Sequence, residues 1–177
     1  MSGYKLADHL APTPVELSIE AWRCVRDAVT YHREYVVDRD GDGDDRQRDQ
    51  VRRLLESADG ITLMISTLLE SNVKPAALNS VTNVAIATLV TRAVDWKRTL
   101  AAIRYYGNRL AYLSRRSLAE LDVTGTVRPI DDTFELDSTA ATADDLPLLR
   151  EASEVIGAAI GAPANARFTG TRAEART

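Results

Sequence analysis

The chain has 177 residues, of which 45% are hydrophobic and 27% are charged, and its net charge is −4. This composition excludes a wholly disordered protein, and the length fits one domain with a core of its own. The single cysteine, Cys24, excludes an internal disulfide and a cysteine-based zinc site, and its apolar helical surroundings predict that it packs in the core.

The first residues lack the continuous apolar run of a signal peptide, and polar side chains interrupt the longest uncharged stretch, residues 75–91. We therefore expect no membrane contact, and a location in the cytoplasm or within a virion-like assembly. Residues 1–12 are expected to form an extended leader. Thr13-Pro14-Val15-Glu16 has the pattern of a capping box with proline in the first turn, which predicts a helix from Thr13 to about Val37.

Two longer helices are predicted next. After the Gly- and Asp-rich break at 38–45, apolar residues at helical spacing predict a helix over 45–71, which ends before the turn at Pro75. Residues 80–121 contain no proline and one glycine, Gly107, and their apolar residues again recur at helical spacing. This stretch predicts one very long helix, or two stacked halves with a bend at Gly107. We find no internal repeat in the sequence.

The end of the chain changes character. Residues 122–137 combine β-branched residues, a proline and rough alternation, and they predict a small β hairpin or an extended arm. A second capping-box pattern at 142–145 opens a last helix over about 146–160, which Gly161 ends. Residues 162–177 are expected to be a flexible tail or a docking arm. The fold class expected for the domain, residues 13–161, is therefore mostly α: an up-down helical bundle with a minor β element.

The break between the first two helices is a candidate metal site. Its sequence resembles the start of an EF-hand calcium loop, and the resemblance implies calcium ligands at Asp38, Asp40, Asp42, Asp44 and Asp49. The loop departs from the EF-hand pattern, because Arg46 stands beside the site and aspartate replaces the expected glutamate at its last position. The alternative interpretation is a solvated acidic turn that binds no cofactor.

Charge is segregated along the chain. Residues 92–116 hold seven basic residues against one acidic, and residues 131–154 hold eight acidic residues against one basic. Either the two segments pack together, or they form complementary faces on neighbouring subunits. The candidate interaction residues are Arg92, Arg98, Arg104, Arg109, Arg115 and Arg116. Interleaved tyrosines would also permit non-specific contact with DNA or RNA, since aromatic rings stack on bases.

A third candidate is catalytic. Arg26 and His32 are separated by five residues, in a pattern that resembles the active site of HEPN-fold ribonucleases, which are helical bundles. The resemblance implies that histidine transfers a proton while arginine holds a phosphate. The alternative is a histidine on a helix surface. The sequence contains no P-loop, no nucleophile-elbow motif and no zinc-protease motif.

These features favour a non-enzymatic structural or adaptor protein that assembles into a homo-oligomer and contacts another protein. A very long helix, opposite charge blocks and terminal arms would suit a head-to-tail ring. The general layout resembles the helical head–tail adaptor proteins of tailed viruses, which implies a ring docked on a portal around DNA. A calcium-binding helical protein and a HEPN-like ribonuclease are the alternatives.

Overall fold

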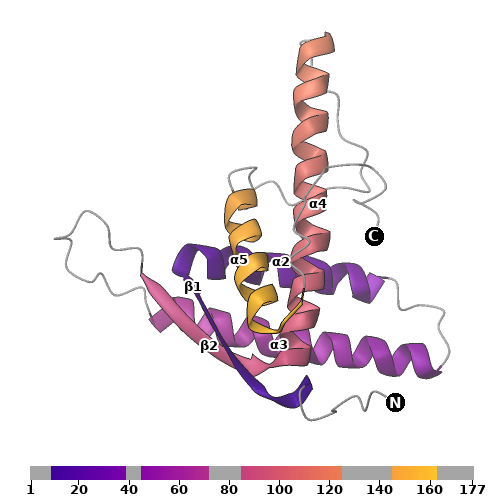
Figure 1. Cartoon of the computed structure of the whole chain (residues 1–177). Coiled ribbons are helices and arrows are strands. Elements are labelled where there is room, and N and C mark those ends of the chain that lie inside the picture. Colours follow the sequence, from indigo (N-terminus) through magenta and orange to yellow (C-terminus); the bar gives the residue numbers. More distant parts are fainter. Residues whose placement is uncertain (1–8, 39–44, 72–84, 125–144, 163–177) are drawn as a thin grey trace.

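The computed structural model describes residues 9–38, 45–71, 85–124 and 145–162, with side chains described as far as Glu34 in the first helix and Ala111 in the longest one. The elements are listed in chain order: β1 Pro12–Ser18, α2 Ile19–Asp38, α3 Asp45–Ser71, β2 Ile86–Arg92, α4 Ala93–Thr124 and α5 Leu146–Ala159 (Figure 1). The protein is mostly helical with one small antiparallel sheet, which confirms the predicted fold class.

The sheet does not lie where the sequence predicted it. It pairs β1 with β2, so residues 12–18 and 86–92 are strands and not the first turns of the predicted helices. In β1 buried and exposed side chains alternate, as expected for a strand with one buried face, and the inward side chains of Val15 and Leu17 are both only 2% exposed. The first helix begins after the strand, where the hydroxyl of Ser18 accepts a hydrogen bond from the amide of Ala21, 3.1 Å away. Ser18, and not Thr13, is therefore the N-cap.

The remaining predicted boundaries are close to the observed ones. The second helix spans 45–71 as predicted, and the last helix, α5, ends at Ala159. Gly161 follows it with a φ of 65°, and its amide and that of Ala162 donate to the last turn, so glycine ends the helix as predicted. Asp145 occupies the N-cap of α5 without a side-chain cap bond. The first three residues of the predicted hairpin, 122–124, belong to α4, and the rest lies outside the described residues.

Two tryptophans fill the centre of the core. The side chains of Trp22 on α2 and Trp96 on α4 are fully buried, and their rings lie 5.8 Å apart between centroids. Each indole also reaches a strand. The Nε1 of Trp22 donates to the carbonyl of Ala87 in β2 at 2.9 Å, and the Nε1 of Trp96 donates to the carbonyl of Thr13 in β1 at 2.8 Å. Helix α2 is therefore bonded to β2, the strand that precedes α4, and helix α4 is bonded to β1, the strand that precedes α2.

These contacts reveal an internal two-fold arrangement that the sequence did not show. The equivalent residues of the two bonds lie 74 positions apart in the sequence. Trp96 follows Trp22 by 74 positions, and Ala87 follows Thr13 by 74 positions. The backbone bonds that close the sheet follow the same rule, since Ile19 donates to Ala85 and Ala93 donates to Ala11. The chain thus contains two strand–helix–helix halves, β1-α2-α3 and β2-α4-α5. A two-fold axis at the middle of the sheet relates β1 to β2 and α2 to α4.

The two halves cross. In Figure 1, α2 and α3 run across the view as an antiparallel pair, while α4 and α5 run up it, and the sheet lies along one side of the body. The long helix α4 extends beyond its neighbours. Its 32 residues correspond to about 48 Å at 1.5 Å per residue. Among the described helices, none combines the length and the apolar character needed to cross a membrane.

Candidate functional site

The outer face of the sheet carries two exposed large apolar side chains. Inward residues of both strands cover the tryptophans, and the alternate residues point away from the body. On this outer face Ile86 is 62% exposed and Val90 is 51% exposed, and Leu10, just before β1, is 53% exposed. Isolated exposed apolar residues are common, but Ile86 and Val90 lie on one sheet face together with the exposed Pro12 and Pro14.

The two edges of this sheet differ. Ile19 with Ala85, and Ala93 with Ala11, are hydrogen-bonded pairs, so along the ladder the odd-numbered residues exchange the inter-strand bonds. The backbone groups of even-numbered residues therefore point to the outer edges. In β1 two of these positions are Pro12 and Pro14, which have no N–H.

The outer edge of β2 lacks this protection. Ile86, Thr88 and Val90 direct their amides and carbonyls outwards, and no third strand joins β2 among the described residues. Proline at an edge prevents a further strand from pairing there, whereas an unprotected edge can accept one. Among the described residues, the edge of β1 is therefore partly blocked by proline, whereas no strand lies beside the edge of β2.

A polar network fixes the junction between the open strand and α4. The carboxylate of Asp95 is 4% exposed and accepts a hydrogen bond from Ser57 on α3 at 2.7 Å. It also binds the guanidinium groups of Arg92, at 2.7 Å, and Arg98, at 3.4 Å. Arg98 donates in addition to the carbonyl of Arg53, so the network joins β2, α3 and α4. Arg92 and Arg98 thus act structurally in this junction.

Of the other predicted interaction arginines, only Arg104 and Arg109 have described side chains, and these two differ in exposure. Arg104 is exposed on α4, but Arg109 is only 8% exposed and its guanidinium lies 4.9 Å from the ring centre of Tyr105. Burial raises the pKa of Tyr31, and the positive charge of Arg109 offsets part of this increase. The side chains of Arg115 and Arg116 lie outside the described residues.

The predicted calcium loop lies mostly outside the described residues. Asp40, Asp42 and Asp44 belong to the stretch 39–44, and only the backbone of Asp38 is described, at the end of α2. Asp49 is on the exposed side of α3 and forms an ion pair with Arg52 at 2.9 Å. Within the described residues no group of three His, Cys, Asp or Glu side chains could hold a metal.

The predicted ribonuclease pair lies on α2 and is engaged in the fold. Arg26 forms two hydrogen bonds to the carboxylate of its neighbour Asp27. His32 packs edge-on against Tyr105, with 5.3 Å between ring centres, and burial lowers its pKa. Residues six apart on a helix point about 120° away from each other, so the two side chains do not converge within one copy.

Cys24 is buried, as predicted. Its Sγ lies 3.5 Å from the Oδ1 of Asp145 at the start of α5. Burial raises the pKa of the Cys24 thiol to about 12, and the negative charge of Asp145 adds to this increase. The thiol therefore stays protonated and unreactive at neutral pH.

Sequence reasoning missed the sheet surface because it placed Ile86 and Val90 in a helix. The available signal was the run Thr88-Leu89-Val90-Thr91, which is rich in β-branched residues. Comparisons with protein families, with curated proteins and with solved structures find no match to this chain.

Proposed function

We propose that this chain is a structural or adaptor protein that acts by assembly and not by catalysis. The observation that supports the proposal is the open outer edge of β2, which adjoins the exposed side chains of Ile86 and Val90. An added strand would satisfy the outward backbone groups, and the apolar side chains would supply affinity. On the opposite edge Pro12 and Pro14 have no N–H, so that edge offers fewer backbone donors to an added strand.

The partner strand would come from a second copy of the chain. Pairing of β2 with another β2 would close a two-fold dimer, whereas an arm from a neighbouring subunit would give a head-to-tail ring. Charge segregation would favour the ring, because the exposed basic residues Lys97 and Arg104 of one copy would face the acidic stretch 131–154 of the next. A head–tail adaptor ring of a tailed virus, placed near a portal and DNA, is the setting that this layout resembles.

The test is size-exclusion chromatography with light scattering on purified protein, at low and high protein concentration and at low and high salt. The wild-type chain is expected to form a discrete oligomer. Val90→Lys should shift it to a monomer, because it places a charge on the open strand that an added strand would have to bury. Val90→Thr keeps a β-branched side chain and serves as the matched control, with the oligomer retained.

Two outcomes would overturn the proposal. One is a wild-type monomer under all conditions, and the other is an oligomer that Val90→Lys leaves intact while its circular dichroism is unchanged. The molecular mass separates a dimer from a ring, and loss of the oligomer at high salt would assign its orientation to charge pairing.

A further inference from the structure

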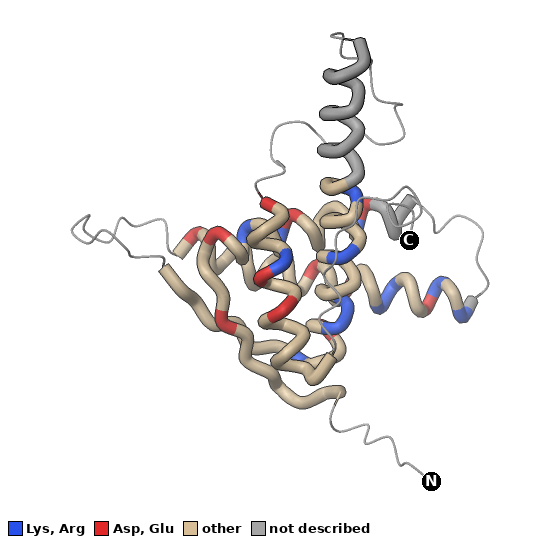
Figure 2. The backbone as a smooth tube through the Cα atoms, turned by 45° about the horizontal axis from the view of Figure 1, so that its top comes forward, with Lys and Arg blue, Asp and Glu red and all other residues tan. Residues whose placement is uncertain are grey.

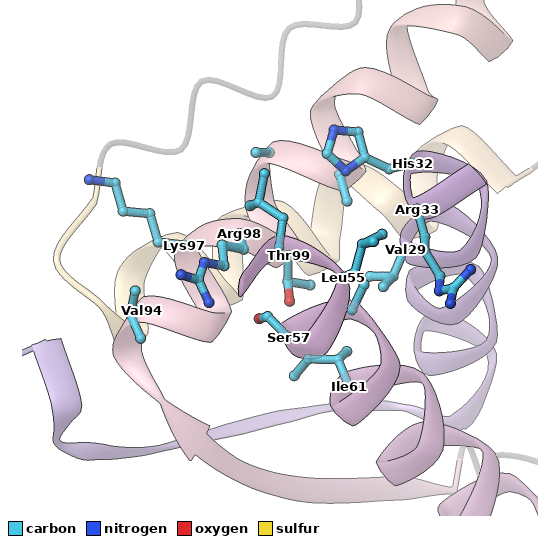
Figure 3. Close-up of a pocket in the computed structure, with 14 residues that line it drawn as sticks. Val29, His32, Arg33, Leu55, Ser57, Ile61, Val94, Lys97, Arg98 and Thr99 are labelled. Carbon is cyan, nitrogen blue, oxygen red and sulfur yellow. The ribbon is translucent and has the colours of Figure 1, made fainter. Parts of the chain in front are cut away.

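A cavity of about 310 Å³ lies between α2, α3 and the beginning of α4 (Figure 3). This volume is at the lower end of the range for small-molecule sites, roughly 300–1,000 Å³. Its walls are largely apolar, and the principal contributors are Val29, Leu55, Ala58, Ile61, Ala101 and Ala102. The hydroxyls of Ser57 and Thr99 also line it, but both are engaged with Asp95, at 2.7 and 2.9 Å. The cavity therefore favours the apolar part of a ligand.

A second hollow of about 450 Å³ shares two lining residues, Leu54 and Arg98, with the first. The other described residues of its lining come from the first three turns of α3: Arg46, Asp49, Gln50 and Arg53. Figure 2 shows basic positions on this part of α3 and on α4. Among the described residues of its lining, the polar hollow has three guanidinium groups and one carboxylate, Asp49, which is paired with Arg52.

Two of the three arginines are available to bind an anion. Neither Arg46 nor Arg53 forms an ion pair with another described side chain, and both are exposed. They lie seven positions apart, which places them on the same face of α3, close to its N-terminus. Guanidinium groups bind phosphate and carboxylate with paired hydrogen bonds, and a helix N-terminus also favours negative charge.

The other cations at the apolar cavity do not offer the same site. The guanidinium of Arg33 is held by Asp59. Lys97 lines the cavity, but in Figure 3 its side chain extends away from the centre. The concentration of available positive charge therefore lies at the end of the cavity where Leu54 and Arg98 join it to the polar hollow.

We propose that the two hollows form one binding site for a small amphipathic anion, with a single alkyl chain in the apolar cavity and a phosphate or carboxylate head group at Arg46 and Arg53, at the end where Arg98 lines both hollows. This site is separate from the sheet edge, and the proposal does not depend on assembly. The two parts of the ligand match the two adjoining environments, since burial of methylene groups is favourable in one and charge pairing in the other.

The experiment is isothermal titration calorimetry of the full chain with decyl phosphate below its micelle concentration. Decanoate tests the other head group, decanol lacks the charge, and inorganic phosphate lacks the chain. We expect both anions to bind, with decanol and inorganic phosphate at least about tenfold weaker. Between hexyl and decyl phosphate the affinity should rise about fourfold for each added methylene, which corresponds to ~0.8 kcal/mol.

Three variants locate the site. Ala101→Phe fills the cavity from an exposed position and should abolish binding, whereas Arg53→Glu should weaken it about tenfold or more. Arg104→Glu changes an exposed arginine of α4 outside both hollows and is the matched control. Circular dichroism checks that each variant is folded, and Arg46→Glu repeats the charge test independently.

The proposal is wrong if decanol binds as tightly as decyl phosphate, since no head-group site would then exist. It is also wrong if Arg104→Glu weakens binding as much as Arg53→Glu, because non-specific charge would then explain the effect. Binding to phosphatidylglycerol vesicles that persists in Ala101→Phe, without binding of the monomeric anion, would assign the arginines to a membrane surface and overturn the cavity site.

Discussion

The crossed tryptophans allow a quantitative test of the internal two-fold arrangement. Trp22→Phe removes the indole donor to Ala87, and Trp96→Phe removes the equivalent donor to Thr13. Both tryptophan side chains are fully buried, and both donate to a strand of the other half of the chain. If the two halves are equivalent, the two substitutions should lower the free energy of unfolding by similar amounts.

The size of the effect follows from two contributions. Each lost hydrogen bond should destabilise the fold by about 1 kcal/mol, because the strand carbonyl that accepted it keeps its ladder bond to the other strand. The smaller ring leaves a void in a fully buried site, which adds roughly 1–2 kcal/mol. We therefore expect each variant to be about 2–3 kcal/mol less stable than the wild type. The rings are in contact, so the double variant should depart from additivity by about 0.5–1.5 kcal/mol.

The assay is equilibrium urea unfolding followed by far-ultraviolet circular dichroism, since the fluorescence of a chain with two tryptophans changes when either is replaced. Leu10→Ala is the control, because Leu10 is 53% exposed and its replacement should have little effect. An unchanged m-value would show that the variants unfold from the same compact state. A large loss for one tryptophan and none for the other would refute the equivalence of the two halves.

Two further predictions concern buried ionisable groups. The unfolded Cys24 thiol loses its proton near pH 9 and the folded thiol only near pH 12, so the unfolded chain binds fewer protons between these values. Between pH 9 and 12 the free energy of unfolding should therefore fall by about 1.4 kcal/mol per pH unit because of this thiol. Urea unfolding at a series of pH values measures this slope, and Cys24→Ala should remove it. A slope that is the same in Cys24→Ala would contradict the assignment. Asp95→Ala leaves Arg98 without its carboxylate in a half-buried site and should destabilise the fold by about 2–3 kcal/mol in the same assay. Asp59→Ala, which breaks the exposed pair with Arg33, should change stability by less than about 1 kcal/mol, and equal losses in both variants would argue against the buried network.

The sequence predicted those elements whose signals are local. The helix over 45–71 has apolar residues at helical spacing and is preceded by a run of glycine and aspartate, so both its type and its bounds could be read from nearby residues. The end of α5 was predictable because Gly161 adopts a left-handed conformation that favours glycine. Burial of Cys24 followed from its position in an amphipathic pattern.

The strands could not be predicted in the same way, because each depends on a partner far along the chain. Thr13-Pro14-Val15-Glu16 is compatible with a helix start, and only the pairing of Val15 with Leu89 makes it a strand. Propensity is a weak guide where tertiary contacts decide. The same error hid the exposed face of the sheet. In the predicted helix Val90 would face the core, whereas in the strand the two-residue period directs its side chain outwards.

The burial of Arg109 could not be predicted from the sequence for a related reason. The sequence shows that Arg109 is charged, but it does not show that a ring of Tyr105 lies beneath it in the core. The pairing of Arg92 and Arg98 with Asp95 has a local sequence signal, because each arginine stands three residues from the aspartate. The two adjoining hollows depend on the packing of three helices and have no sequence signature.

The crossed halves also determine when the protein can fold during its synthesis. The ribosome releases β1 and α2 first, but the carbonyl that receives the Trp22 indole, at Ala87, is made 65 residues later, and Trp96 follows. Until then the apolar side of α2 has no partner strand, and the nascent chain carries an incomplete core. Until the second half emerges, the first half can therefore form only the α2–α3 pair, and the sheet can close only once β2 has been made.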